Sequence, residues 1–149
     1  YWPQLFLGLT FNWGIIMGWT SITNSISIEP LMLYLSAIFW TLGYDTIYGL
    51  QDIRDDEIIG VKSTSIKFKN NVKVFVGTCY SLCVLCILIL GLLMEIDKYL
   101  LALSTFFILS LIYQIKIFKT DNPKSCLLSF RMNNLTGLLI FLFIFSFNF

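Results

Sequence analysis

The chain contains no histidine among its 149 residues, and lysine, arginine, aspartate and glutamate together make up only 13% of it. Without histidine, and with only four cysteines, the sequence supports neither a zinc centre nor a disulfide framework. Soluble domains carry roughly 25% charged residues, so the shortage of charge excludes a soluble protein. The formal net charge of +1 leaves no dense basic face, which argues against nucleic acid as a partner.

The sequence also lacks linkers and internal repeats, and it consists largely of long apolar runs. No Ser-, Gly- or Pro-rich segment divides the chain, so a single domain is expected. Hydrophobic residues make up 57% of it, and the mean hydropathy is +0.80. A helix of about 20 apolar residues crosses a bilayer core of about 30 Å. The sequence therefore predicts an all-α integral membrane bundle with five transmembrane helices, at residues 5–28, 31–50, 74–94, 99–115 and 132–149.

The positive charges predict the orientation of these helices. Every Lys and Arg except Lys98 lies in one of two connections, residues 53–73 and 116–131. The positive-inside rule assigns such connections to the cytoplasmic or matrix side. With five alternating passes, Tyr1 is then expected on that side and Phe149 on the opposite side.

Five of the nine acidic residues lie between Tyr44 and Thr64. If the second helix continues past residue 50, Asp45, Asp52 and Asp56 share one face, because their spacings of seven and four are helical. Gly60 is expected to end this helix, since glycine adopts the left-handed conformation easily. The sequence thus predicts a stripe of three carboxylates near one surface of the membrane.

Carboxylates one helical turn apart repel each other, and a bound divalent cation offsets that repulsion. Mg²⁺ typically takes one or two carboxylates together with phosphate oxygens, which makes Asp52 and Asp56 candidate ligands. Lys62 and the hydroxyls of Ser63 and Thr64 follow and are expected to contact phosphate oxygens. The alternative is a charged, solvated helix end in which Arg54 and Lys62 pair with the acids.

These residues also carry a family resemblance. Tyr44-Asp45-Thr46-x-Tyr48, then Asp52-x-x-Asp55-Asp56 and Gly60-x-Lys62-Ser63-Thr64, resembles the second aspartate-rich motif of the UbiA superfamily of intramembrane aromatic prenyltransferases. Trp2-Pro3-Gln4 with Phe11-Asn12-Trp13-Gly14 is similar to the preceding helix of its 4-hydroxybenzoate polyprenyltransferases. The resemblance covers essentially the whole chain. It implies that residues 1–149 are the C-terminal part of one transmembrane domain, holding the last five of nine helices and an acidic cap at about 52–73.

The resemblance implies an activity and a role for each motif residue. The activity is Mg²⁺-dependent transfer of a polyprenyl group from its diphosphate to the ring of 4-hydroxybenzoate, or a related phenolic acid, in ubiquinone synthesis. Asp52 and Asp56 would bind Mg²⁺ and diphosphate, and Lys62 the phosphates. Asp45 would orient the acceptor or take its ring proton. The remaining substrate-site residues would be Tyr44 and Tyr48, lining the cavity, and Arg54, which together with Asp55 would support the metal ligands by pairing. The membrane would be a bacterial or mitochondrial inner membrane, with the motif on the cytoplasmic or matrix side.

Family members carry another, earlier motif of the type Asn-Asp-x-x-Asp, and no Asn-Asp dipeptide occurs in this sequence. Half of the metal site, and a basic residue for the aromatic carboxylate, are therefore expected in a missing N-terminal half, and the chain alone is expected to be inactive. Two other functions stay open. One is an ion or solute carrier whose cation path is Asp45, Asp52 and Asp56. The other is a truncated remnant without catalytic activity.

Overall fold

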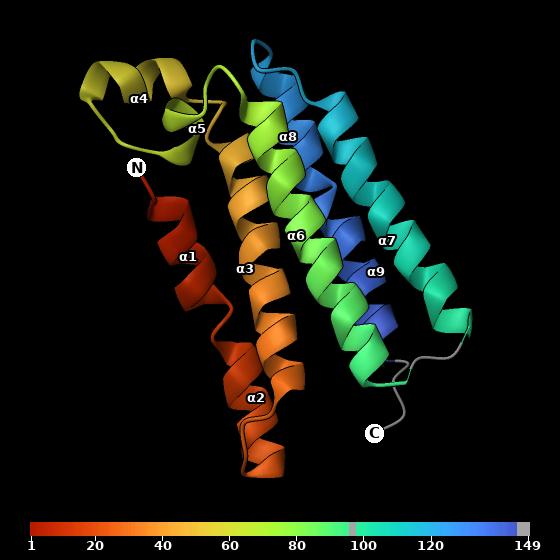
Figure 1. The fold of residues 1–149 in the computed structure, drawn as a ribbon. Helices are drawn as coiled ribbons and strands as arrows, with labels where there is room; N and C mark the ends of the chain where they lie inside the picture. The colour runs from red at the N-terminus through yellow and green to blue at the C-terminus, as the bar shows by residue number, and fades with distance from the viewer. Residues whose placement is uncertain (96–97, 146–149) are drawn as a thin grey trace.

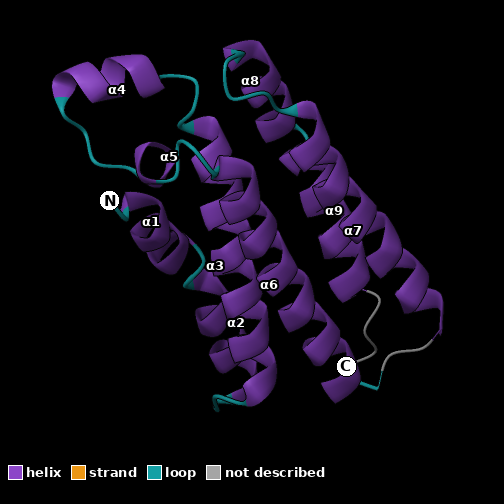
Figure 2. Ribbon diagram, turned by 45° about the horizontal axis from the view of Figure 1, so that its top comes forward, coloured by secondary structure: helices purple, strands orange, loops and turns teal. Residues whose placement is uncertain are grey.

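The computed structural model describes residues 1–95 and 98–145, with the backbone alone for 98–103. Figure 2 shows only helices and loops in this part of the chain, which confirms the all-α class. The helices are α1 (Pro3–Phe11), α2 (Gly14–Thr23), α3 (Ile28–Tyr48), α4 (Ile53–Ile59), α5 (Thr64–Lys67), α6 (Val72–Leu93), α7 (Lys98–Ile117), α8 (Pro123–Arg131) and α9 (Asn133–Phe145).

The long helices form rods that run up and down side by side (Figure 1). The rods are α1 followed by α2, then α3, α6, α7, and α8 followed by α9. The short helices α4 and α5 lie at one end, which we call the motif end, together with the connection from α7 to α8 (Figure 1). The chain enters at the motif end and α9 runs away from it. The rods thus alternate in direction as the predicted passes do, but of the five predicted passes only three correspond, among the described residues, to helices long and apolar enough to cross a membrane.

Length, composition and exposure all indicate a membrane protein. Among the described residues, Pro3–Thr23, Val72–Leu93 and Pro123–Phe145 are long and apolar enough to cross a bilayer. Buried residues make up only 11%, 44% and 17% of their apolar windows, so most of these side chains face outward. Ile22 and Leu92, for example, are 84% and 82% exposed. Lipid is the solvent in which such a surface is stable.

Small residues and polar side chains hold the rods together. Gly43 of α3 lies so close to the ring of Tyr80 on α6 that a Cβ atom would overlap it. The Tyr80 hydroxyl donates to Gln114 Oε1 (2.6 Å), and Gln114 Nε2 donates to Thr136 Oγ1 (2.8 Å). These bonds connect α6, α7 and α9 through fully buried groups. Polar groups in lipid need such partners, because no water is available there.

The boundaries of two predicted helices differ from the structure. The first rod is broken at Asn12 and Trp13 rather than continuous. The last rod begins at Pro123, whereas residues 116–131 were predicted as a connection. Lys124 and Arg131 led to that error, but both are exposed on the first helix of this rod and therefore stay solvated. Residues 146–149 of the predicted last span lie outside the described residues.

Candidate functional site

The acidic motif does not form one continuous helix. α3 ends at Tyr48, residues 49–52 form turns and bends, and α4 begins at Ile53. Figure 1 shows that α4 lies across the motif end instead of prolonging α3. Gly49 lies at this break and packs closely against Ser65, because a Cβ there would lie 2.5 Å from the Ser65 hydroxyl oxygen. The prediction of an uninterrupted helix from residue 45 to residue 60 is therefore wrong.

The break separates the three predicted carboxylates into two groups. Asp45 is half-buried on α3, whereas Asp52 immediately precedes α4 and Asp56 lies in the first turn of that helix. The Asp56 amide donates to the Asp52 carbonyl oxygen at 2.9 Å, so these two residues are one helical turn apart. Across the part of the chain that the structure describes, no group of three or more acidic, His or Cys side chains is suited to hold a metal. The predicted three-carboxylate face is therefore not formed.

The donor set of Asp52 and Asp56 nevertheless fits magnesium. Asp52 is exposed, Asp56 is half-buried, and neither forms an ion pair within the described residues. Mg²⁺ typically binds one or two protein carboxylates and completes its shell with substrate oxygens and water. Two carboxylates one turn apart at the bundle's end can supply the protein's share of such a shell.

Gly60 ends α4 as predicted. Its φ of +82° lies in the left-handed region, and its amide donates to the Asp56 carbonyl at 3.0 Å. The Val61 amide donates to the same oxygen at 2.9 Å. This cap reverses the chain and returns residues 61–64 to the bundle, which places Lys62 beside the start of the chain.

The residues after Lys62 form a buried clasp between α1, α3 and α5. The Thr64 hydroxyl lies 2.7 Å from that of Thr46, and the Thr64 amide donates to Gln4 Oε1 at 3.1 Å. The Ser65 hydroxyl donates to the Thr46 carbonyl at 2.8 Å, and Ser63 Oγ accepts the amide of Ile66. The Ser63 and Thr64 hydroxyls therefore fasten the loop, and the expectation that they contact phosphate is wrong.

The clasp also holds residues that sequence reasoning did not single out. Gln4 is only 7% exposed and Thr46 is fully buried. The sequence did contain one indication of the role of Gln4. It is a single glutamine in the apolar start of α1, and an amide in lipid needs a hydrogen-bond partner. Lys62 itself stays exposed, with its Nζ 5.8 Å from the centre of the Tyr1 ring.

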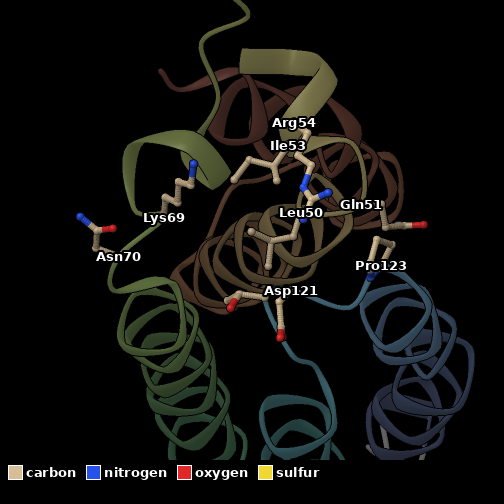
Figure 3. Close-up of a pocket in the computed structure, with 9 residues that line it drawn as sticks. Leu50, Gln51, Ile53, Arg54, Lys69, Asn70, Asp121 and Pro123 are labelled. Carbon is tan, nitrogen blue, oxygen red and sulfur yellow. The ribbon is translucent and has the colours of Figure 1, made fainter. Parts of the chain in front are cut away.

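Arg54 lines a cavity of about 540 Å³ at the motif end. Figure 3 shows Arg54, Lys69 and Asp121 arranged around it. Lys69 Nζ forms an ion pair with Glu57 Oε1 at 2.7 Å. Arg54 forms no ion pair with any residue that the structure describes. The predicted pairing of Arg54 with the metal-ligand candidates is therefore not formed.

Tyr44 lines a second cavity of about 320 Å³, where α1, α3, α8 and α9 meet. We call it the amide cavity, because three of its lining residues are asparagines. On α3, Trp40, Tyr44 and Tyr48 are each four residues apart and form one aromatic row with Phe130 of α8. The amide cavity is lined by Phe11, Asn12, Trp40, Thr41, Tyr44, Phe130, Arg131, Asn133 and Asn134.

A third cavity, of about 590 Å³, is lined mainly by apolar side chains. It lies between α2, α3, α6 and α9, toward the end of the bundle opposite the motif. Leu33, Leu90 and Ile144 are among its lining residues. The two cavities nearer the motif end thus include charged or amide side chains, whereas the distant one is almost entirely apolar.

Comparison with known proteins shows one consistent likeness. The family model described as the UbiA prenyltransferase family matches residues 1–145. A mitochondrial 4-hydroxybenzoate polyprenyltransferase of Bos taurus is 41% identical over 148 residues, covering 95% of this chain and 38% of the relative. The protein of that name from Drosophila melanogaster is 39% identical over 143 residues, covering 95% and 36%. The chain thus spans little more than a third of these relatives, and no solved structure matches it.

Proposed function

This chain belongs to the UbiA prenyltransferase family, and from that premise we propose that it supplies one part of an aromatic prenyltransferase. The whole enzyme would transfer a polyprenyl group from polyprenyl diphosphate to the ring of 4-hydroxybenzoate, or a related phenolic acid, in ubiquinone synthesis. The observation that carries the proposal is the 41% identity, over 95% of the chain, to a relative named for that reaction.

In this proposal Asp52 and Asp56 hold Mg²⁺ together with the diphosphate. The two residues lie one helical turn apart at the motif end, and the first Asp-rich motif would complete the site from the rest of the protein. A bound metal neutralises the charge that develops on a leaving diphosphate. The chain alone, which lacks that first motif, is expected to be inactive.

The remaining motif residues act on the two substrates. Lys62 offers an exposed ammonium group to the phosphates. As the allylic C1–O bond breaks, the carbon ortho to the phenolic hydroxyl forms the new bond to C1, and the ring proton then leaves. Asp45, half-buried beside Tyr44, orients the acceptor or takes that proton. Enclosure among membrane helices excludes the water that would quench an allylic cation.

The location is part of the proposal. Arg54 belongs to α4, Lys62 to the loop after it and Lys119 to the connection from α7 to α8, and these segments lie at the motif end (Figure 1). The positive-inside rule then puts this end on the matrix side of a mitochondrial inner membrane, or on the cytoplasmic side of a bacterial one. The lipid-facing surface of the rods makes the bilayer a direct partner.

Metal removal tests the proposed reaction. Full-length protein in liposomes, given polyprenyl diphosphate and 4-hydroxybenzoate, is expected to form prenylated product with Mg²⁺ and none after chelation by EDTA. Restored Mg²⁺ should restore the product, measured by chromatography. Ion flux through the same liposomes without any prenylated product would instead favour the carrier.

Lys62 allows a separate test of diphosphate binding. Lys62→Ala should raise the KM for polyprenyl diphosphate about tenfold, because a charge-assisted hydrogen bond contributes roughly 1.5–3 kcal/mol. Lys62→Arg keeps the charge and should stay close to wild type. The KM for the aromatic acceptor should not change in either variant. An unaltered diphosphate KM in Lys62→Ala would remove Lys62 from the site.

A further inference from the structure

The 540 Å³ cavity at the motif end lies on the side of α4 that faces away from the candidate metal ligands. Helical residues follow one another at 100°, so Arg54 projects about 160° away from both Asp52 and Asp56. Figure 3 shows the Arg54 side chain among the residues of the cavity wall, and neither aspartate lines it. The cavity is therefore separate from the proposed metal site. We call it the basic cavity, and its polar wall includes Arg54, Lys69, Asn70, Thr120 and Asp121.

The wall of the basic cavity brings together three segments that are distant in sequence. Arg54 comes from α4, Lys69 from the connection between α5 and α6, and Asp121 from the connection between α7 and α8. The Lys69 ammonium already has a partner, because its Nζ lies 2.7 Å from Glu57 Oε1. Arg54 is exposed and, within residues 1–95 and 98–145, takes part in no ion pair. An anion in the cavity would thus meet an uncompensated guanidinium group.

Further lysines surround the basic cavity. Lys73 lies in the first turn of α6, and its Nζ is 5.3 Å from the centre of the Phe118 ring, so the start of α6 lies beside the end of α7. Lys116 and Lys119 flank Phe118 in the sequence. All three lysines are exposed. An excess of positive charge therefore remains here after the carboxylates of Glu57 and Asp121 are subtracted.

Apolar side chains lie next to these cations on the outer faces of α6 and α7. Val74 follows Lys73 on α6 and is exposed. On α7, Ile112 and Tyr113 are exposed and lie one turn before Lys116, because spacings of four and three share a helix face. A ligand at this position would meet positive charge at the motif end and apolar side chains farther along the rods. That pattern fits a phospholipid better than a free anion.

We propose that the basic cavity binds the phosphate headgroup of an anionic membrane phospholipid. Basic pockets between membrane helices bind such headgroups, because phosphate oxygens accept charge-assisted hydrogen bonds. The guanidinium of Arg54 offers paired donors for this purpose, and Asn70 and Thr120 add neutral ones. The acyl chains would lie against α6 and α7. The headgroup would join α4 to two other segments and so hold in place the short helix that contains Asp56.

The lipid dependence of thermal stability tests this site. Delipidated full-length protein in a neutral detergent should gain several degrees in melting temperature when cardiolipin is added, and much less with phosphatidylcholine, whose headgroup has no net charge. Arg54→Gln removes the uncompensated cation, so the cardiolipin concentration for half of the gain should rise about tenfold. Arg54→Lys keeps the charge and should lie between Arg54→Gln and the wild type.

Lys67→Gln is the matched control for Arg54→Gln. It removes one positive charge at the motif end, but Lys67 Nζ lies 4.4 Å from the centre of the Trp2 ring and does not line the basic cavity. Its cardiolipin dependence should equal that of the wild type. An equal loss in Lys67→Gln would overturn the site in favour of general surface charge.

Three other results would also overturn the lipid site. They are an unchanged cardiolipin dependence in folded Arg54→Gln, equal stabilisation of the wild type by phosphatidylcholine, and equal stabilisation by inorganic phosphate, which would indicate a site for free anions. None of these measurements involves prenyl transfer. Failure of the proposed function and failure of the lipid site can therefore be told apart.

Discussion

Asp52→Asn and Asp56→Asn should each reduce the kcat of prenyl transfer by about a thousandfold or more. Asparagine keeps the size of the side chain but removes the negative charge that binds Mg²⁺. A catalytic metal stabilises transition-state charge by several kcal/mol, and each 1.36 kcal/mol is a factor of ten in rate. The measurement is product formation by full-length protein at saturating substrates, over a range of Mg²⁺ concentrations.

Asp55→Asn is the matched control for this pair. Asp55 lies on the same short helix and is exposed, so the variant changes the charge of α4 equally. It should lose less than about tenfold, as expected for a group whose surface charge pairs contribute about 0–1 kcal/mol. Normal turnover in Asp52→Asn or Asp56→Asn would rule out the metal assignment. Equal losses in all three variants would point to the charge of α4 as a whole.

The sequence predicted the end of α4 correctly, but it did not predict how the motif before that helix is arranged. Gly60 was identified as a helix end because its left-handed conformation is a local property of glycine. The break before Asp52 was missed, because it depends on contacts distant in sequence. Thr64 reaches Gln4 across 60 positions, and Gly49 is held against Ser65. Helical periodicity contains no information about such contacts.

Apolar runs predicted the rods, but charge misled the placement of the last one. Long hydrophobic segments are a direct consequence of bilayer thickness, so the five rods followed from composition. Lys124 suggested a loop, although Asn122 before Pro123 is a helix-start pattern, and Asn122 Oδ1 accepts the Ser125 amide in the structure. The amide cavity was beyond sequence reasoning, since Trp40 and Asn133 are 93 positions apart.

Gly43→Ala should destabilise the bundle by about 1–3 kcal/mol, the usual effect of overpacking a core. The added methyl group would overlap the Tyr80 ring, and Tyr80 cannot move away freely, because it is 2% exposed and bonded to Gln114. The measurement is the melting temperature of the full-length protein in detergent. Gly77→Ala is the control, since a Cβ at Gly77 on α6 would meet nothing within 4 Å.

The same pair of variants connects packing to function. α3 carries Trp40, Tyr44 and Asp45, so displacing it from α6 would shift the wall of the amide cavity and the carboxylate beside it. Gly43→Ala is therefore expected to raise the acceptor KM as well as to lower stability, whereas Gly77→Ala should leave the KM unchanged and raise stability by about 0.5–1 kcal/mol, because alanine is the better helix former. A Gly43→Ala protein as stable as the Gly77→Ala control would show that the α3–α6 contact is looser than the structure indicates. Normal stability with a raised acceptor KM would show that the Tyr80 ring shifts to make room for the methyl group without loss of packing, and that α3 is displaced enough to affect the acceptor.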